Sequence, residues 1–181
     1  DLRRTLFMFM ALCVIITIFT SEIHPIQLQN PPTFTLAQSL PVQSRTSVGL
    51  EATTFDLSAR VVHHGEELDV TIYWQALTTI QDNYKSRVLL RDMNNRVVWY
   101  TGDLQYPSPV LSKRWERNLY VADIHHILIP DNLILGEYQV LIELYPCDAT
   151  SCNMDTPALF FDINGSLVGK QLELPLTITV Q

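Results

Sequence analysis

Two pairs of adjacent histidines are the residues of this sequence best suited to bind a metal ion: His63 with His64, and His125 with His126. Imidazole nitrogen is a common ligand of zinc. Neighbouring residues on a strand point to opposite faces, so each pair can offer one ligand to a given site. A site would need both pairs to meet beside a carboxylate such as Asp123. Surface or turn histidines are the simpler interpretation, and we predict no metal site and no cofactor.

Signatures of other reactive sites are missing from the sequence. No serine lies in the G-x-S-x-G pattern that exposes a nucleophile in many hydrolases. The C-x-x-C-H pattern of haem attachment is also absent. The sequence therefore predicts no catalytic residues, and we expect the protein not to be an enzyme.

A group of aromatic residues offers a different kind of chemistry, the stacking of sugar rings. The group lies near Arg114 and Arg117 and consists of Trp99, Tyr100, Tyr106, Trp115 and Tyr120. Aromatic side chains also fill sandwich cores and protein interfaces. We single out Trp99, Tyr106 and Trp115 as candidate contacts with a glycan or with a partner protein.

Two of the three cysteines are spaced for a disulfide. Cys147 and Cys152 bracket the segment CDATSC, and closing so short a ring contributes about 2 kcal/mol in the chain-entropy description. A zinc site would need further ligands, and no second Cys pair exists. Cys13 lies in an apolar run, where a thiol behaves as a small apolar residue.

The first element that positions these residues is an apolar segment near the N-terminus. No charge occurs from Thr5 to Ser21, and a helix of this length spans about 25 Å, the low end of what crosses a bilayer. The predicted membrane span includes Leu6, Phe7, Phe9, Leu12, Val14, Ile15, Ile16, Ile18 and Phe19.

The charges around this segment predict its orientation. Arg3 and Arg4 precede it, and no Lys or Arg follows until Arg45, so the N-terminus is expected in the cytoplasm. A cleaved secretion signal has similar charged and apolar regions, but IFTSEIHP shows no clear small-x-small cleavage site. We therefore expect residues 1–22 to be a retained single-pass anchor in the cell membrane, with the C-terminal domain on the periplasmic or extracellular side.

The remainder divides into a linker and one domain. Residues 23–46 are rich in Pro and Gln, which predicts an extended spacer, and residues 47–181 form a single exported domain. Within it, period-two alternation in LDVTIYWQAL is typical of a half-buried strand. NYKSRVLLRD and RVVWY predict a hairpin closed by residues 92–95. Repeated strand and turn signals predict a mainly β fold, an Ig-like antiparallel β-sandwich of about seven or eight strands.

Composition limits the class of partner. The formal net charge is −7 at pH 7, so we expect no nucleic-acid partner. The same acidic balance disfavours peripheral binding to anionic lipid, so attachment to the lipid bilayer is expected to come from the helix.

The order of several segments resembles a known family. The segments are SVGLEATTFDLSARVVHHGEELDVTIYWQAL, NYKSRVLLRDMNNRVVW, YPSPVLSKRWERN and IPDNLILGEYQVLIELY. Together they resemble the Ig-like C-terminal β-sandwich of dolichyl-phosphate-mannose mannosyltransferase-like (family 39 glycosyltransferase-like) membrane proteins of filamentous phototrophic bacteria, over roughly residues 47–180. The resemblance implies a fold and a topology. It carries over no catalytic residue, because the catalytic carboxylates of that family belong to its multi-span part. RWERN replaces the family's W-x-x-G-E pattern, and CDATSC replaces a short turn.

These observations favour a non-catalytic, single-span accessory subunit of a larger membrane complex, either energy-transducing or transport. Its helix and linker are expected to contact integral membrane subunits, and its sandwich is expected to contact an exported subunit. Two alternatives stay open. The chain begins with Asp1 rather than Met, so it could be the exported tail of a glycosyltransferase-like enzyme whose other spans lie upstream. It could also be a membrane-anchored carbohydrate-binding module.

Overall fold

The structure is a computed structural model that describes residues 40–118 and 120–181. The predicted anchor (1–22) and the predicted linker up to residue 39 lie outside these ranges. Within the described ranges, no helix combines the length and apolar character that crossing a membrane requires.

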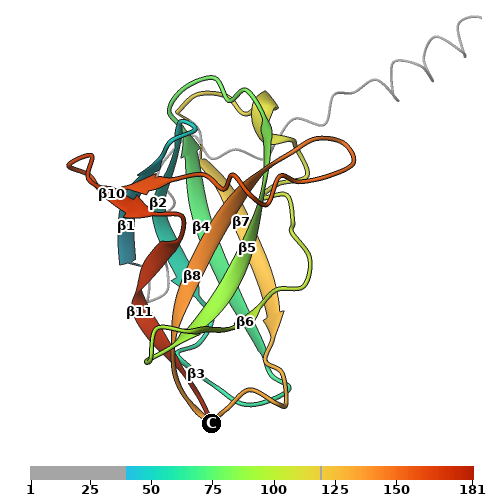
Figure 1. The fold of residues 1–181 in the computed structure, drawn as a ribbon, viewed down its shortest axis with the longest axis vertical. Coiled ribbons are helices and arrows are strands. Elements are labelled where there is room, and N and C mark those ends of the chain that lie inside the picture. Colours follow the sequence, from blue (N-terminus) through green and yellow to red (C-terminus); the bar gives the residue numbers. More distant parts are fainter. Residues whose placement is uncertain (1–39, 119) are drawn as a thin grey trace, which may run out of the picture.

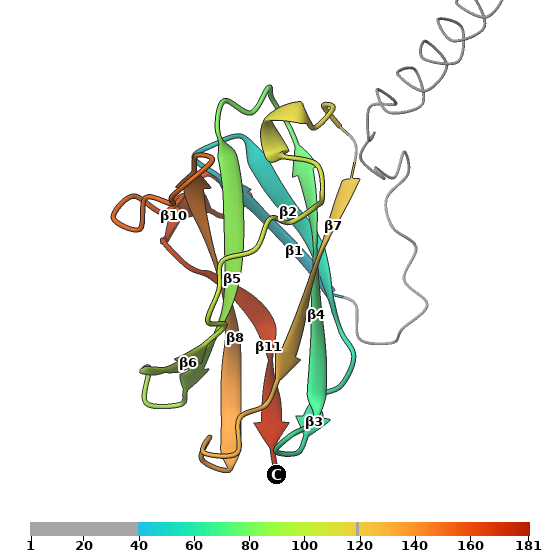
Figure 2. The same cartoon turned by 90° about the vertical axis from the view of Figure 1, so that its right-hand side faces the viewer.

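The described chain is a β-sandwich of two sheets, which confirms the predicted mainly β fold (Figure 1). Figure 2 shows the two sheets edge-on as two layers. The six-stranded sheet has the order β10 (Leu167–Gly169), β9 (Phe160–Phe161), β1 (Leu40–Thr46), β2 (Leu50–Leu57), β4 (Glu67–Ala76) and β7 (Tyr120–Leu128). The five-stranded sheet has the order β3 (Val61–Val62), β11 (Leu172–Val180), β8 (Gly136–Cys147), β5 (Asn83–Asp92) and β6 (Val97–Tyr100). Neighbouring strands are antiparallel, except that β3 runs parallel to β11.

Strand β4 shows how the sequence builds the core. Its alternating residues Leu68, Val70, Ile72, Trp74 and Ala76 are fully buried between the sheets, and the residues between them face outward. This is the predicted inner face, and it follows from the two-residue period of a strand. The Trp74 ring packs against Phe160 of the same sheet, with 6.5 Å between ring centroids.

The predicted hairpin of β5 and β6 is present. Asp92 closes its turn, because its Oδ1 accepts hydrogen bonds from the backbone N–H groups of Asn94 and Arg96. Asn95 adopts a positive φ of 65°, a conformation that asparagine tolerates well. The hairpin positions Trp99 and Tyr100 beside β5.

The boundary between linker and domain differs from the prediction. Residues 40–46, expected to end the linker, form β1 and pair with β2 and β9. A bulge between Pro41 and Ser44 admits Gln43 at a φ of 49°. Strand β9 reaches only Arg45 and Thr46, so Pro41 lies where β1 has a single hydrogen-bonded neighbour, a position that proline accepts.

Strand β8 is buried on both faces, whereas the alternation of its sequence predicted one inner face. The inner residues Tyr138, Val140, Ile142 and Leu144 are buried as expected. On the outer face, Leu141, Glu143 and Tyr145 are buried as well. Polar contacts with Arg87 and Gln171 cover Glu143 and Tyr145 on this face.

Candidate functional site

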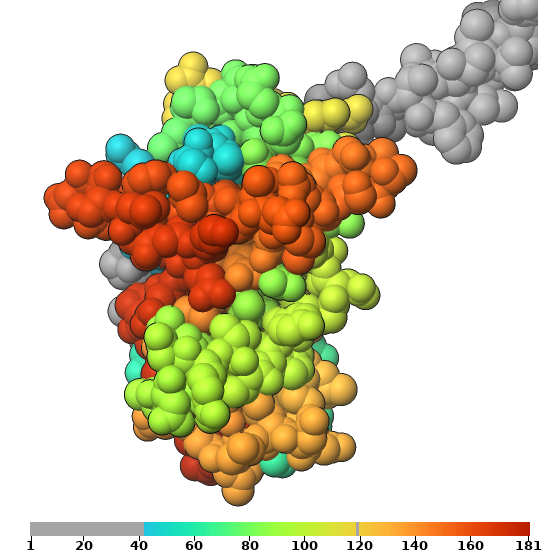
Figure 3. Space-filling view, in the orientation of Figure 1, coloured from blue at the N-terminus to red at the C-terminus, as the bar shows by residue number. Residues whose placement is uncertain are grey.

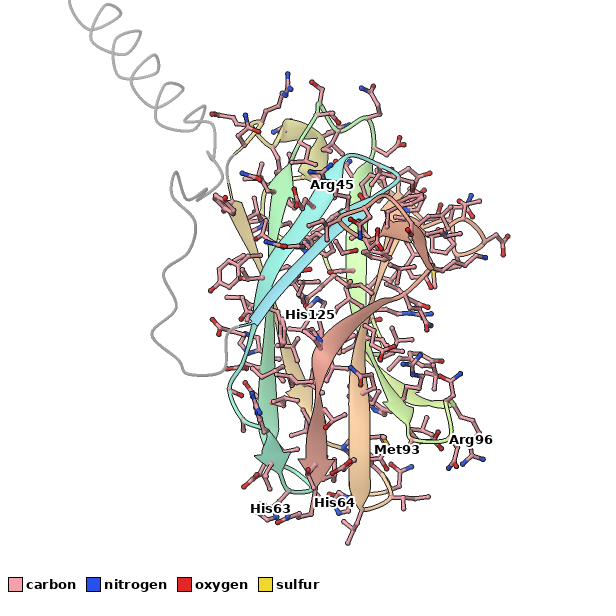
Figure 4. All side chains as sticks on the ribbon, turned by 90° about the vertical axis from the view of Figure 1, so that its left-hand side faces the viewer. Arg45, His63, His64, Met93, Arg96 and His125 are labelled. Atoms are coloured by element: carbon pink, nitrogen blue, oxygen red, sulfur yellow. A yellow bond between two sulfur atoms is a disulfide. The ribbon has the colours of Figure 1, made fainter. Side chains whose placement is uncertain are left out.

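The two histidine pairs do not meet. In β7 the alternation places His125 between the sheets, only 2 % exposed, and His126 on the outer face. His63 and His64 lie at one end of the sandwich, and His125 lies farther along it (Figure 4). His63 and His64 each bond a main-chain carbonyl oxygen there. The described residues therefore form no metal site from the two pairs together.

His125 belongs instead to a buried polar cluster around Asp123. One carboxylate oxygen, Oδ2, accepts hydrogen bonds from Trp74 Nε1 at 3.0 Å and from Ser86 Oγ at 2.7 Å. The other, Oδ1, lies 3.2 Å from Gln105 Nε2 and 3.2 Å from His125 Nε2. Ser86 comes from the five-stranded sheet, whereas Trp74, Asp123 and His125 come from the six-stranded sheet. The cluster therefore connects the two layers through the core.

Gln105 brings a loop into this cluster. It belongs to the connection from β6 to β7, which runs along the open side of the sandwich between β5 and β7 (Figure 2). Its backbone exchanges two hydrogen bonds with Ser86. Its side-chain amide also donates to the carbonyl oxygen of Ile124 at 2.7 Å. The loop is thus held to both sheets by one residue.

The cluster holds a Ser, a His and an Asp, but its geometry is not that of a hydrolase. In a catalytic triad the serine faces one imidazole nitrogen and the aspartate faces the other. Here Ser86 Oγ and Asp123 Oδ1 both face Nε2 of His125, at 3.1 and 3.2 Å. The Ser86 hydroxyl donates directly to the carboxylate, and Ser86 is fully buried. No substrate reaches this oxygen in the described fold.

The environment of Asp123 favours its charged form. Burial alone would raise the pKa of this carboxyl, because it disfavours the charge. His125 and the hydrogen bonds from Ser86 and Trp74 outweigh burial, so the pKa of Asp123 lies below its ordinary value. A buried carboxylate with several donors is well suited to hold the two sheets in one relative position.

A group of partly exposed cations lies on the outer face of the five-stranded sheet. We call Lys85, Arg87 and Arg91 of β5 the basic strip, since they lie on the outward face of one strand, with the buried Leu89 between Arg87 and Arg91. The ammonium of Lys85 lies 4.6 Å from the ring centroid of Tyr106, within the range of a cation–π contact. Arg91 forms an ion pair with Glu173 of β11.

Arg87 is the best fixed member of the basic strip. Its guanidinium lies 4.9 Å from the ring centroid of Tyr100 and 5.2 Å from that of Tyr145. Its Nε donates to Glu143 Oε2 at 2.7 Å, and its Nη2 donates to the Tyr145 hydroxyl at 3.0 Å. Gln171 Nε2 donates to the other oxygen of Glu143 at 2.9 Å. These contacts cover the outer face of β8.

The pKa values of Tyr145 and Glu143 are both shifted by the contacts between these groups and Arg87. Burial and the neighbouring Glu143 raise the pKa of Tyr145 to about 12. Burial would raise the pKa of Glu143 too, but hydrogen bonds from Gln171, Tyr145 and Arg87 hold it below its ordinary value. Near neutral pH, Arg87 therefore faces a charged carboxylate and a neutral phenol.

Two hollows flank the basic strip. One, of about 380 Å³, lies between Arg91, Glu143 and residues 168–171. The other, of about 470 Å³, lies between Lys85, residues 102–104 and the loop 148–152. Figure 3 shows this face, where the region from the end of β8 to β11 (orange to red) projects above the β5–β6 hairpin (green).

A disulfide closes the loop at the second hollow. Cys147 and Cys152 are bonded to each other. Between them, Asp148 Oδ1 accepts hydrogen bonds from the backbone N–H groups of Thr150 and Ser151, both at 2.7 Å. The loop therefore presents a fixed rim to the hollow.

The aromatic candidates are distributed differently from the prediction. Tyr106 lies on the outer face, with its hydroxyl 3.4 Å from the carbonyl oxygen of Asp148. Trp99 is partly buried and packs against the core. Trp115 is 5 % exposed, and its indole N–H donates to the carbonyl oxygen of Val110. Trp115 is thus a core residue, and its burial corrects its assignment to a stacking platform.

The sequence interpretation missed Arg87, Glu143 and Tyr145. A signal for Arg87 was present in the sequence. The outward positions of the predicted strand 83–92 carry Lys85, Arg87 and Arg91, so the alternation that identified the strand also placed three cations on one face.

Comparisons with known proteins find similarity only to solved structures, and at low sequence identity. No protein-family model matches the chain, and no curated protein matches it either. Among solved structures, the C-terminal domain of wzt shares 11 % identity at a TM-score of 0.48, covering 78 % of this chain and 82 % of that one. Pseudomonas fluorescens alkylpurine DNA glycosylase AlkC, bound to DNA with an abasic site analogue, shares 7 % identity at a TM-score of 0.41. That match covers 78 % of this chain and 31 % of the glycosylase.

Proposed function

We propose that the protein is a non-catalytic, single-span accessory subunit of a larger energy-transducing or transport complex, and that its exported sandwich binds another subunit through the basic strip. The observation that carries this proposal is a contrast of burial. The described Ser-His-Asp cluster is closed inside the core, whereas Arg87 and Arg91 are partly exposed and Tyr100 is 52 % exposed on the outer face of the five-stranded sheet.

The basic strip has properties that favour recognition. Arginine and tyrosine are enriched where protein interfaces contribute most binding energy. The guanidinium of Arg87 is already held by Glu143 and Tyr145, so a partner would lose little free energy in ordering it. Tyr100 is 52 % exposed beside it and offers an apolar ring at the same place.

The proposed membrane attachment rests on the N-terminal sequence. The apolar run after Arg3 and Arg4 would anchor the chain with its N-terminus in the cytoplasm. The domain would then lie on the periplasmic or extracellular side. The Cys147–Cys152 disulfide supports this placement, because such bonds persist in oxidising compartments.

The strand order supports an Ig-like topology as part of the proposal. The neighbours β2, β4 and β7 correspond to strands A, B and E of an immunoglobulin domain, and β11, β8, β5 and β6 correspond to G, F, C and C′. An Ig-like fold is also what the sequence resemblance to the mannosyltransferase-like family implies.

Site-specific photo-crosslinking tests the proposal. The full chain, purified from membranes in mild detergent, would carry a photoreactive residue in place of Tyr100. The matched control would carry it in place of Ile124, which is 46 % exposed on the outer face of the other sheet. We expect a crosslinked partner from position 100 and none from position 124. A protein recovered only as a monomer, with no product at either position, would contradict the proposal.

Carbohydrate binding is the second candidate, and the pairing of cations with the exposed ring of Tyr100 and the partly exposed ring of Tyr106 favours it. Arg87 with Tyr100, and Lys85 with Tyr106, offer flat surfaces beside two hollows. Glycan arrays would test this candidate with Tyr100→Ala as the variant and Ile124→Ala as the control. Trp115 is unsuitable for this purpose because its replacement would disturb the core. Equal signals from wild type and Tyr100→Ala would eliminate this face as a glycan site.

A further inference from the structure

Three metal-binding side chains converge on the opposite face of the molecule, the outer face of the six-stranded sheet. Asp69 of β4 and His126 of β7 are direct partners in the sheet register. Glu67 lies two residues before Asp69 and so shares its face of β4. The ligand atoms of the three side chains all lie within 4.8 Å of one another. We call these residues the β4–β7 cluster.

The contacts within the cluster centre on one nitrogen atom. His126 Nδ1 lies 2.7 Å from Asp69 Oδ1 and 3.2 Å from Glu67 Oε1. The neighbouring His125 points into the core and takes no part. In the described structure, both carboxylates therefore face the same imidazole nitrogen.

This donor set matches the chemistry of zinc. Zinc binds imidazole nitrogen and carboxylate oxygen at about 2.0–2.2 Å with tetrahedral geometry, which separates neighbouring ligand atoms by about 3.4 Å. The 3.2 Å separation from Glu67 already approaches this value. The 2.7 Å separation from Asp69 needs to open by about 0.7 Å to reach it. Because all three side chains are substantially exposed, small rotations achieve this without disturbing the core.

Charge and access also favour a cation. Two carboxylates and one imidazole carry a net negative charge when the imidazole is neutral, the form that binds metals. The exposed fractions of the side chains are 62 % for Glu67, 44 % for Asp69 and 64 % for His126. A fourth coordination position would therefore remain open to water or to a donor from another molecule, as in zinc sites with three protein ligands.

We propose that Glu67, Asp69 and His126 form a binding site for a divalent transition-metal ion, zinc foremost, on the outer face of the six-stranded sheet. This proposal is independent of the proposed function, since the basic strip lies on the other sheet. The site would attach an ion by three side chains from two paired strands whose spacing the β4–β7 ladder fixes.

Calorimetric titration with zinc chloride tests the site on the metal-free full chain in mild detergent. We expect saturable binding of one ion per chain. Asp69→Asn and His126→Ala should each weaken it by about 100-fold or more, because even residues behind the metal ligands commonly contribute about 10–100-fold. His63→Ala, at an exposed histidine outside the cluster, should bind zinc as the wild type does.

A second readout separates loss of the site from loss of the fold. Zinc should raise the Tm of wild type and of His63→Ala, because an ion that binds only the folded state stabilises it. It should leave the Tm of His126→Ala unchanged, while all variants keep the wild-type circular dichroism spectrum. No saturable binding by the wild type would overturn the proposal and would identify the cluster as an ion pair. Binding that persists equally in Asp69→Asn and His126→Ala would also overturn it.

Discussion

The Ser86 hydroxyl donates a 2.7 Å hydrogen bond to Asp123 Oδ2, and this bond joins strand β5 of one sheet to strand β7 of the other. Both residues are fully buried. In most sandwiches the two layers meet through apolar side chains. Apolar contacts are not directional, so they constrain the relative position of the two sheets less than hydrogen bonds do. Here a charged acceptor with oriented donors fixes one relative placement of the layers, and with it the alignment of β5 and its basic strip.

Removing a donor from this cluster should destabilise the fold. We expect Ser86→Ala to lower the free energy of unfolding by about 1–3 kcal/mol, because Asp123 loses a buried hydrogen bond. Asp123→Ala should cost about 3–5 kcal/mol, since it leaves several buried donors without an acceptor. Urea unfolding monitored by tryptophan fluorescence measures both. Thr71→Ala on the outer face of β4 is a control with little expected effect, and a Ser86→Ala variant as stable as this control would contradict the assigned role.

Acid should weaken the same cluster. Because the folded pKa of Asp123 lies below the unfolded value of about 3.9, its contribution to stability is present above that value. It is lost as the pH falls through the folded pKa. We expect the Tm of wild type to fall below about pH 5, and the Tm of Asp123→Asn to fall less steeply. Parallel curves for the two proteins between pH 7 and pH 2 would refute this prediction.

Tyr145 should titrate late. Its pKa of about 12 means that the folded state keeps a proton that the unfolded state releases near pH 10, so this group lowers stability as the pH rises above about 10. Absorbance at 295 nm during alkaline titration should show a late step that Tyr145→Phe removes. Glu143→Gln should move that step to lower pH, because the neighbouring negative charge helps to hold the proton. An unchanged late step in Tyr145→Phe would assign it to another tyrosine.

Loss of the Cys147–Cys152 disulfide should loosen the loop 148–152, which borders the second hollow, more than it loosens the core. Replacing Cys147 and Cys152 together by Ser should lower the free energy of unfolding by about 2 kcal/mol, the contribution expected for a short ring. Hydrogen exchange should increase in the loop 148–152 and stay unchanged in β4. Faster exchange throughout both sheets would show that the bond supports the whole fold instead.

The sequence predicted the inward-facing residues best for strands that have one face in the core and the other in water. The alternation in 68–76 identified the inner face of β4, because solvent on one side and core on the other impose a period of two. It failed for Glu143 and Tyr145 of β8, which are buried by contacts with Arg87 of β5 and with Gln171 of the turn between β10 and β11. The alternation within one segment does not reveal which of its outward side chains are buried by residues from other segments.

The candidate sites depended on the register between strands, which a two-residue period fixes only to within an even number of residues. Ser86 and Asp123 are 37 residues apart and lie on different sheets, so their contact follows from how the layers stack. Asp69 and His126 meet because β4 and β7 pair in one particular alignment. Strand β1 was assigned to the linker for a related reason, since its partners β2 and β9 had to be known before a segment with Pro41 was recognised as a strand.

The side chain of Gln105 has a consequence for self-association. Strand β7 pairs with β4 along one side and is the edge of its sheet on the other, so its backbone groups that point away from β4 would offer a template for a strand from a second molecule. Gln105 already donates to the Ile124 carbonyl oxygen near the middle of that edge. An incoming strand would have to displace this bond before it could continue along β7. The residue that anchors the loop thus also occupies an acceptor that edge-to-edge pairing would need.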